Sequence, residues 1–415
     1  MPSALVVADD LTGAMDTGHG FAARGRSVRV RRAVGGDPSD TGHADVLVVD
    51  TDSRDDDPAA AATAVARAVD AHPAELVYKK VDSTLRGNVV AEVDAAVAAA
   101  RADLAVVAPA FPATGRTTEG GRHLVDGTPL AEAGYGASES ALRTLFAPSD
   151  YPAARVESPT VEAGADAVAD RLTAIASSNR PALAICDAAT DDHLAAIADG
   201  AASTGPNALY VGSGGLAARV AVPGESPAAA DPRADSSGES GVLGVVGSVN
   251  ERTLAQLAPV DDAVVVTLDP AAAVRDPETV GRAAADALTD SLGRRGRAVV
   301  TAATGADDVR VAERGAADVD AVAADRIATA LAAAARATVD GAALGGLFLT
   351  GGDVAGSVLD ALDAAELALA GESVADGVPV GQITAGPAAG TRVVTKAGGF
   401  GDRRVILNCL DAVGA

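Results

Sequence analysis

The segment from Leu76 to Asn88, LVYKKVDSTLRGN, holds a dense group of charged and hydroxyl side chains. It starts with apolar residues typical of a strand and then places Lys79 and Lys80 beside acidic, hydroxyl and arginine side chains. These are two of the chain's three lysines, and the third is Lys396. A strand that ends in such a cluster is where an α/β protein usually binds its ligand. An exposed loop with a helix-capping hydroxyl is the alternative, but the placement of the lysines favours a functional site.

Two further strand ends carry side chains of the same kind. The predicted strand Ala4–Ala8 leads directly into Asp9 and Asp10, and paired carboxylates there can bind a metal, a hydroxyl group or a proton in transfer. A phosphatase of the haloacid dehalogenase type would need Asp-x-Asp-x-Thr, so that class is excluded. Capping of the next helix by Asp10 is the structural alternative. Arg54 follows the predicted strand Val46–Asp50, where an arginine fork can bind a carboxylate.

The segment between Pro109 and Gly127 combines rigid prolines, permissive glycines and the arginines Arg116 and Arg122. Such a composition predicts a shaped loop that binds an anion. His123 in this segment is either an acid–base group or a hydrogen-bonding residue, and the second role is commoner for a single histidine beside an arginine.

Glycine pairs follow two predicted strands in the second half of the chain. One is Gly351–Gly352, followed by Asp353, and the other is Gly398–Gly399, preceded by Lys396. A strand, a glycine pair and a helix bring backbone amides close to a phosphate group. No lysine has the spacing of a Walker A loop, and protein-kinase signatures are missing. The segment 212–217, GSGGLA, formally fits the dinucleotide fingerprint, but a single fit of this kind is weak evidence.

These side chains need a scaffold of strands that alternate with helices, which predicts an α/β fold of two domains, each a mainly parallel sheet flanked by helices. A single core rarely exceeds about 250–300 residues, and this chain has 415. The stretch 223–241 is rich in Pro, Ala, Ser and Gly and is the best candidate for a linker. We therefore expect one ligand-binding domain at 1–222 and a second, phosphate-binding domain at 242–415.

The composition limits the partners and the cellular location. The formal net charge of −24 repels nucleic acids and anionic membranes. This acidity, with so few lysines, suggests a halophilic protein. Two distant cysteines favour the reducing cytoplasm without a disulfide framework. We expect no signal peptide at the acidic start and no membrane span, because no apolar run approaches the roughly 20 residues required.

With these motifs assembled, the chain resembles the four-carbon acid sugar kinases, which phosphorylate threonate, erythronate or 3-oxo-tetronate with ATP. The resemblance covers nearly the whole chain and depends on nine blocks in the order of the family. They are ADDLTGA (8–14), DSR (52–54), KKVDSTLRGN (79–88), APAFPATGR (108–116), CDA (186–188), GSGGLA (212–217), GSVNERTLAQL (247–257), LTGGDVAG (349–356) and KAGGFGD (396–402).

The resemblance implies a sugar-acid domain followed by a nucleotide domain. The residues expected to hold the sugar acid are Asp10, Arg54, Lys80, Asp82, Ser83, Thr84, Leu85 and Arg86. Those expected to hold ATP are Ser248, Gly351, Gly352, Asp353, Val354, Lys396, Gly398 and Gly399.

Phosphoryl transfer needs mainly positioning and charge neutralisation. Asp82 or Asp10 could accept the proton of the substrate hydroxyl, and the sequence does not rank them. Lys80 or Lys396 could offset charge on the γ-phosphate, and Asp353 could bind Mg²⁺.

Two other functions remain open at this point, namely a sensor that binds a sugar acid without catalysis and a nicotinamide-dependent oxidoreductase. The particular four-carbon acid and a homo-oligomeric state also remain open.

Overall fold

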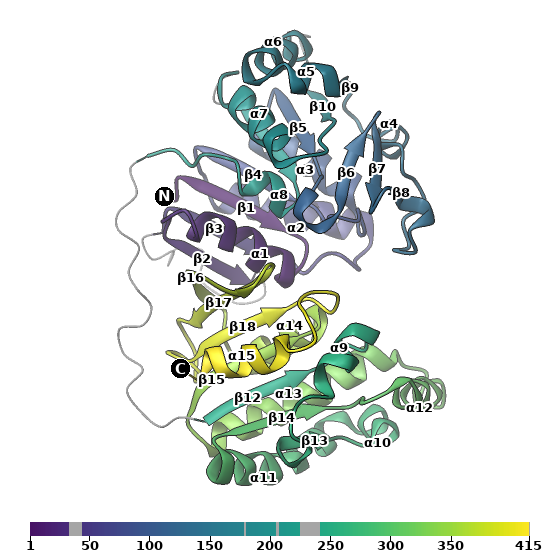
Figure 1. Ribbon diagram of the computed structural model, residues 1–415, viewed down its shortest axis with the longest axis vertical. Coiled ribbons are helices and arrows are strands. Elements are labelled where there is room, and N and C mark those ends of the chain that lie inside the picture. The colour runs from purple at the N-terminus through teal and green to yellow at the C-terminus, as the bar shows by residue number, and fades with distance from the viewer. Residues whose placement is uncertain (33–43, 178–179, 205–206, 225–240, 415) are drawn as a thin grey trace. The chain divides into compact units, whose positions relative to one another are not determined.

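The computed structural model describes residues 1–32, 44–177, 180–204, 207–224 and 241–414, in which strands and helices alternate (Figure 1). The chain divides into two compact units, unit 1 at Met1–Ala229 and unit 2 at Ala230–Ala415. The prediction of an α/β fold is therefore confirmed. Most of the predicted linker 223–241, residues 225–240, lies outside the described residues.

Unit 1 is built on a sheet in which every neighbouring pair of strands is parallel. Its strands in spatial order are β2 (Val28–Arg32), β3 (Val46–Asp50), β1 (Ala4–Ala8), β4 (Leu76–Lys80), β11 (Ala208–Gly212), β5 (Leu104–Ala108), β10 (Ala182–Cys186) and β9 (Ala153–Val156). Strands β1, β3, β5 and β10 are buried along their whole length, as expected for Val- and Ala-rich strands with helices on both faces.

The order of these strands reverses at one place that matters for function. From β1 the chain passes to β2, returns to β3 between β2 and β1, and then crosses to β4 on the other side of β1. In open α/β sheets, ligands bind beyond the carboxyl ends of the strands at such a switch point. Here β1 and β4 pair directly, with Val7 opposite Lys79.

The helices of unit 1 connect and cover this sheet (Figure 1). They are α1 (Leu11–Ala22), α2 (Pro58–Ala71), α3 (Val89–Ala100), α4 (Leu142–Leu145), α5 (Ser158–Glu162), α6 (Ala165–Ala176), α7 (Asp191–Ala202) and α8 (Gly214–Ala217), with 3-10 turns at Pro112–Thr114 and Leu130–Glu132. The segment predicted to be an anion-binding loop instead forms a small antiparallel sheet of β6 (Arg116–Glu119), β7 (Arg122–Val125) and β8 (Thr128–Pro129).

Unit 2 has a mixed sheet with a parallel core. Its strands in spatial order are β13 (Val265–Thr267), β14 (Arg297–Thr301), β12 (Gly241–Val246), β15 (Leu344–Thr350), β18 (Arg392–Lys396), β17 (Val378–Ile383) and β16 (Glu366–Ala375), of which the last two form an antiparallel hairpin. The order reverses between β12 and β15, which makes this the switch point of unit 2.

The helices of unit 2 flank this sheet (Figure 1). They are α9 (Glu251–Leu257), α10 (Pro270–Arg275), α11 (Pro277–Arg295), α12 (Ala306–Ala317), α13 (Ala323–Gly341), α14 (Gly352–Ala361) and α15 (Val405–Val413), with a 3-10 turn at Asp262–Val264. Within the described ranges, no helix combines the length and the apolar composition that crossing a membrane would require.

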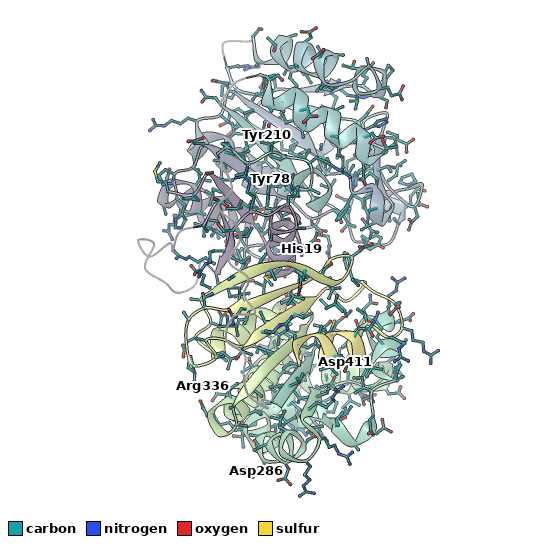
Figure 2. The ribbon with its side chains drawn as sticks, turned by 60° about the vertical axis from the view of Figure 1, so that its left-hand side comes forward. His19, Tyr78, Tyr210, Asp286, Arg336 and Asp411 are labelled. Atoms are coloured by element: carbon teal, nitrogen blue, oxygen red, sulfur yellow. The ribbon has the colours of Figure 1, made fainter. Side chains whose placement is uncertain are left out.

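Charged side chains are found both at the surface and in the interior of the protein. Asp286 and Asp411 are exposed on unit 2 and Arg336 is half-buried near its surface, while Tyr78 is buried inside unit 1 (Figure 2). The three lysines behave differently from these surface charges, because Lys79, Lys80 and Lys396 are only 0%, 4% and 1% exposed. Lysine is almost never buried without partners, so each lysine must serve an internal arrangement.

Candidate active site

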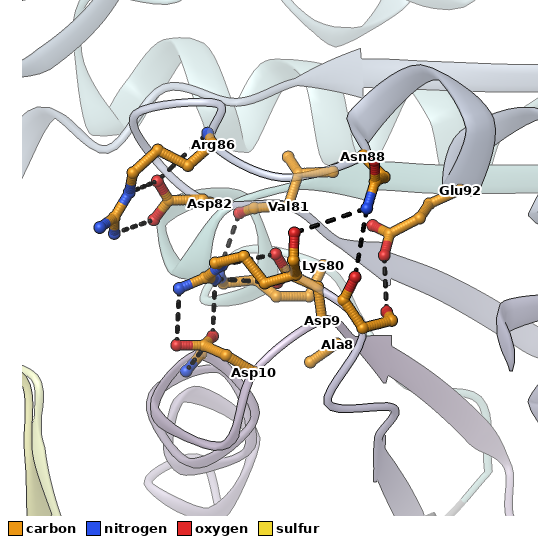
Figure 3. A network of polar contacts seen from close by, with 12 residues as sticks. Ala8, Asp9, Asp10, Lys80, Val81, Asp82, Arg86, Asn88 and Glu92 are labelled. Atoms are coloured by element: carbon orange, nitrogen blue, oxygen red, sulfur yellow. Dashed lines mark hydrogen bonds and ion pairs between the residues drawn. The ribbon is translucent and has the colours of Figure 1, made fainter. Parts of the chain in front are cut away.

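The carboxyl ends of β1 and β4 bring together four charged side chains that are distant in sequence. Asp9 and Asp10 follow β1, and Lys80 and Asp82 lie at and just beyond the end of β4 (Figure 3). A Cβ atom placed on Gly13 would lie 2.6 Å from Asp10 Oδ1 and 2.8 Å from Lys80 Nζ. The first turn of α1 therefore needs glycine, because the carboxylate and the ammonium converge on its backbone.

Arg54, in the loop after β3, donates hydrogen bonds to both Asp9 and Asp10. Its Nε and Nη2 donate to the two oxygens of Asp9 at 2.8 and 2.9 Å, and its Nη1 and Nη2 donate to those of Asp10 at 2.8 Å each. Burial opposes the charged guanidinium, but Asp10 and Asp9 outweigh this effect and raise the pKa of Arg54. The predicted fork thus holds protein carboxylates, so its direct effect is to fix Asp9 and Asp10.

Asp82 is held as a carboxylate by its own loop. The side chain of Arg86 donates to it from Nε at 2.7 Å and from Nη2 at 3.1 Å, and the hydroxyl of Thr84 donates to Oδ2. Burial alone would raise the pKa of Asp82, but the hydrogen bonds from Arg86 and the charges of Arg54 and Lys80 hold it well below the usual range. A carboxylate with such a low pKa is a weak base.

Asp10 has the opposite electrostatic character. It caps α1 by accepting from the backbone N–H of Gly13 at 2.9 Å, and its side chain remains 18% exposed. Burial raises the pKa of Asp10, and the like charges of Asp9 and Asp82 act in the same direction against Arg54. The two candidate bases that the sequence left equal therefore differ in the direction of their pKa shifts.

A buried layer of polar groups, which the sequence did not predict, supports this cluster from behind. Lys79 Nζ forms an ion pair with Glu92 Oε2 at 3.0 Å, and Ser53 Oγ donates to Glu92 Oε1 at 2.7 Å. Asn88 Nδ2 donates to the carbonyls of Ser53 and Arg54 at 3.2 and 3.4 Å. Glu92 of α3 and Asn88 thus fix the loop that carries Arg54. The sequence indicated this layer only through an acidic residue in an otherwise apolar helix.

The other residues predicted in this loop make contacts within the protein. Leu85 adopts a left-handed backbone with φ of 55° while its side chain is buried, a strained conformation of the kind found at functional loops. The carbonyl of Ser83 accepts from His123 Nε2 at 2.8 Å, and His123 Nδ1 lies 3.0 Å from Thr118 Oγ1. Burial lowers the pKa of His123, so its role here is hydrogen bonding.

In unit 2, three predicted nucleotide residues converge at the switch point of the sheet. Gly351 has φ of 98°, and a Cβ atom there would lie 3.1 Å from the backbone nitrogen of Ser248. A Cβ atom on Gly398 would collide with Ser248 Oγ. The loops after β12, β15 and β18 therefore pack closely only because two of the three residues are glycines.

The remaining predicted nucleotide residues flank this point. Gly352, Asp353 and Val354 form the first turn of α14, where Asp353 is exposed and Val354 is buried. Lys396 ends β18, with its ammonium directed at carbonyls of the following loop. Among the described residues no cluster of three or more His, Cys, Asp or Glu side chains could hold a metal ion.

The glycine-rich segment after β11 does not leave room for a dinucleotide. Gly214 and Gly215 are buried, and Cβ atoms on them would lie 2.5 Å from Asp16 Oδ2 and 2.6 Å from the carbonyl of Ala110. These glycines allow the protein to pack against itself, which argues against a pyrophosphate site there.

Comparisons with known proteins agree with two ligand-binding parts. A model described as a sugar-binding N-terminal domain matches residues 4–220, and one described as a nucleotide-binding C-terminal domain matches residues 243–406. A solved structure of a Salmonella typhimurium LT2 protein has the same fold, with a TM-score of 0.80, 22% identity and coverage of 98% of both chains. The fold and the matched domains together define an α/β protein with a sugar-binding and a nucleotide-binding domain.

Curated relatives identify the family. The D-threonate kinase of Bordetella bronchiseptica is 36% identical, covering 98% of this chain and 96% of its own. The D-erythronate kinase of Heliobacterium modesticaldum is 32% identical, covering 99% and 97%, and the 3-oxo-tetronate kinase of Methylobacterium radiotolerans is 33% identical, covering 98% of each. The chain belongs to the four-carbon acid sugar kinase family and is a phosphotransferase, so the sensor and oxidoreductase alternatives are set aside.

Proposed function

We propose that the protein transfers the γ-phosphate of ATP, with Mg²⁺, to the terminal hydroxyl of a four-carbon sugar acid such as threonate, erythronate or 3-oxo-tetronate. The single observation that carries this proposal is the cluster of Asp10, Lys80 and Asp82 at the switch point between β1 and β4. It offers a proton acceptor, a cation and anchored carboxylates within the part of the chain that matches a sugar-binding domain. Full-length similarity to sugar-acid kinases supports the reaction class.

Asp10 is the better candidate for the general base. Base catalysis is most effective when the pKa of the base approaches the working pH. The pKa of Asp10 is raised by burial and by neighbouring carboxylates, whereas that of Asp82 is lowered by Arg86. Asp10 would accept the proton of the hydroxyl group, and Asp82 would hold Arg86 and Thr84 in place.

Arg86 is the better candidate for the carboxylate of the substrate. The side chain of Arg54 is 17% exposed and already forms ion pairs with two aspartates, whereas that of Arg86 is 50% exposed and forms an ion pair with one. A substrate carboxylate could therefore share the guanidinium of Arg86 without displacing a buried ion pair. The ammonium of Lys80 lies beside Asp10, where it would offset negative charge in the transition state.

The nucleotide would bind in unit 2, where Ser248, Gly351 and Gly398 converge. Backbone amides in such glycine loops bind phosphate oxygens. Mg²⁺ bound through one carboxylate and the phosphates of its nucleotide is the common arrangement in kinases. Asp353, exposed on the first turn of α14, fits that single carboxylate.

The test is a coupled assay of ADP release with the stereoisomers of threonate and erythronate and with 3-oxo-tetronate, each with and without Mg²⁺. The proposal expects turnover with at least one of these acids, loss of turnover without Mg²⁺ and phosphate on the terminal oxygen of the product. Turnover restricted to acids of another chain length would refute the substrate class, and phosphate on an inner hydroxyl would refute the assigned position.

A further inference from the structure

The loop 397–401, AGGFG, turns five consecutive backbone carbonyls toward donors of the protein. Lys396 Nζ donates to the carbonyls of Ala397, Gly398 and Phe400 at 2.9, 3.3 and 3.5 Å. The other donors come from α9, and they are Thr253 Oγ1 to Gly398 (2.8 Å), Arg252 Nη1 to Gly399 (2.9 Å) and Gln256 Nε2 to Phe400 and Gly401 (3.0 and 3.1 Å).

The orientation of these carbonyls fixes the orientation of the amides. In a planar trans peptide the C=O and the following N–H point in opposite directions. When the carbonyls of Ala397 and Gly398 point at Lys396, the N–H groups of Gly398 and Gly399 must point away from it. Successive amides that share one direction form an anion-binding concavity, and Gly398 packs closely against Ser248, because a Cβ atom there would collide with Ser248 Oγ.

Lys396 is therefore a lysine with an unusual set of partners. It is 1% exposed, and in the described part of the chain its ammonium also donates to Thr253 Oγ1 at 3.3 Å rather than meeting a carboxylate. Lys79 differs, because it pairs with Glu92. Three carbonyl oxygens and a hydroxyl oxygen are ligands that suit a monovalent cation. Here that cation is the ammonium group of Lys396, which is covalently part of the chain.

We propose that Lys396 is a positioning residue for the nucleotide, a tethered cation whose ammonium holds the carbonyls of Ala397 and Gly398 so that the amides of Gly398 and Gly399 face the phosphates. This inference rests on the proposed binding of ATP to unit 2. It differs from the expectation that Lys396 meets the γ-phosphate, because the cation acts through the loop. Burial lowers the pKa of Lys396 to about 8, so the amine remains largely protonated at neutral pH.

The test uses the full chain with two variants of this lysine. Lys396→Ala leaves an oxygen-lined space that a small cation can enter, and Lys396→Met fills that space with apolar atoms. Arg297→Ala is the matched control, since it removes a half-exposed cation at the start of β14, at the opposite end of the parallel strands from Lys396. The dissociation constants of ADP and ATP are measured in sodium, potassium and ammonium chloride at one ionic strength.

Loss of a supporting group behind a binding site typically costs about 10- to 100-fold in affinity, and we expect both Lys396 variants to lose about this much for ADP and ATP alike. Ammonium or potassium should restore binding in Lys396→Ala but not in Lys396→Met. The wild type and Arg297→Ala should respond equally to all three salts.

Three outcomes would overturn the inference: unchanged affinity in the folded variants, loss of ATP binding with ADP binding retained, and the absence of rescue by any cation. The second outcome would indicate a direct contact with the γ-phosphate. If Lys396→Ala does not fold, Thr253→Val and Thr253→Ser replace it, and only the valine variant should weaken binding. A wild type that binds no nucleotide would instead refute the proposed function.

Discussion

Replacing Asp10 with Asn tests the assignment of the general base most directly. The substitution keeps the size of the side chain and an oxygen that can accept from Gly13, but it removes the proton acceptor. General-base catalysis contributes about 100- to 10,000-fold to a rate, which corresponds to about 2.7–5.4 kcal/mol of the activation free energy. We expect a loss of this size in kcat, with sugar-acid binding largely retained.

The structure also sets the expected cost to folding. Arg54 keeps both of its hydrogen bonds to Asp9 when Asp10 is neutral, so no buried charge is left without a partner. The free energy of unfolding should therefore fall by about 1.5–3 kcal/mol, the range for hydrogen bonds to charged groups, and not by the roughly 3–5 kcal/mol of a broken buried pair. A thermal melt of the variant checks this, so that loss of activity is not confused with loss of fold.

The pH dependence of kcat/KM provides an independent measurement. The pKa of Asp10 lies above the ordinary value of 3.8, and base catalysis is lost as the pH falls through that pKa. The wild type should show this acid limb, and Asp10→Asn should lack it. Asp82, whose pKa is lowered, would give no limb in the same range, so Asp82→Asn should keep the wild-type limb and mainly raise KM.

The opposite pattern would refute the reasoning. If Asp82→Asn is inactive and Asp10→Asn turns over normally, the base is Asp82 despite its low pKa. If both variants keep full kcat, neither carboxylate accepts the proton and the proposed mechanism is wrong.

Three further predictions concern the nucleotide site, a buried carboxyl and salt. Gly398→Ala should raise the KM for ATP by up to about 100-fold, because its Cβ collides with Ser248 Oγ. The control Gly293→Ala, where a Cβ meets open space inside α11, should leave this KM unchanged and add about 0.5–1 kcal/mol of stability. If Gly398→Ala has the KM of the wild type, Gly398 is not part of the nucleotide site. Burial raises the pKa of Asp50 from 3.8 to about 7, so the stability that Asp50 contributes is complete below pH 3.8 and is lost as the pH rises through 7, by at most about 1.4 kcal/mol per pH unit. In denaturant unfolding, the stability of Asp50→Asn should depend less on pH between these values than that of the wild type. An unchanged pH dependence of stability would contradict the raised pKa of Asp50. A net charge of −24 is screened within about 3 Å in 1 M salt, so the melting temperature should rise from dilute buffer to molar KCl, and a constant value would count against a halophilic protein.

Several strands of the first half could be predicted because burial dominates their composition. Ala4–Ala8 and Val46–Asp50 match the observed β1 and β3 residue for residue. In contrast, β2 reads VRVRR and was not predicted, since three arginines in five residues obscure the apolar pattern. Its burial is visible only in the fold, where Val28 and Val30 pair with β3.

The members of the candidate site could be predicted, but their pairing could not. Asp10, Arg54 and Asp82 each follow a strand, and this local signal was sufficient to select them. Which strand ends meet depends on the order of strands in the sheet, a long-range property. Arg54 bonds to Asp9 and Asp10, which lie 45 and 44 positions away in the sequence. No rule of sequence spacing could indicate these contacts.

The positions of the three lysines give a structural reason for the low lysine content of the chain. A protein that uses arginine for nearly all its basic residues keeps lysine at three positions, and all three are buried. An ammonium is a compact point charge with three donors that can be aimed separately, whereas a guanidinium is a planar fork. Lys80 fits against the backbone of Gly13, and Lys396 reaches carbonyls on several sides, which a planar group could not do. Lysine therefore persists in this chain where the geometry requires a small cation, and two of those places are the proposed sugar-acid and nucleotide sites.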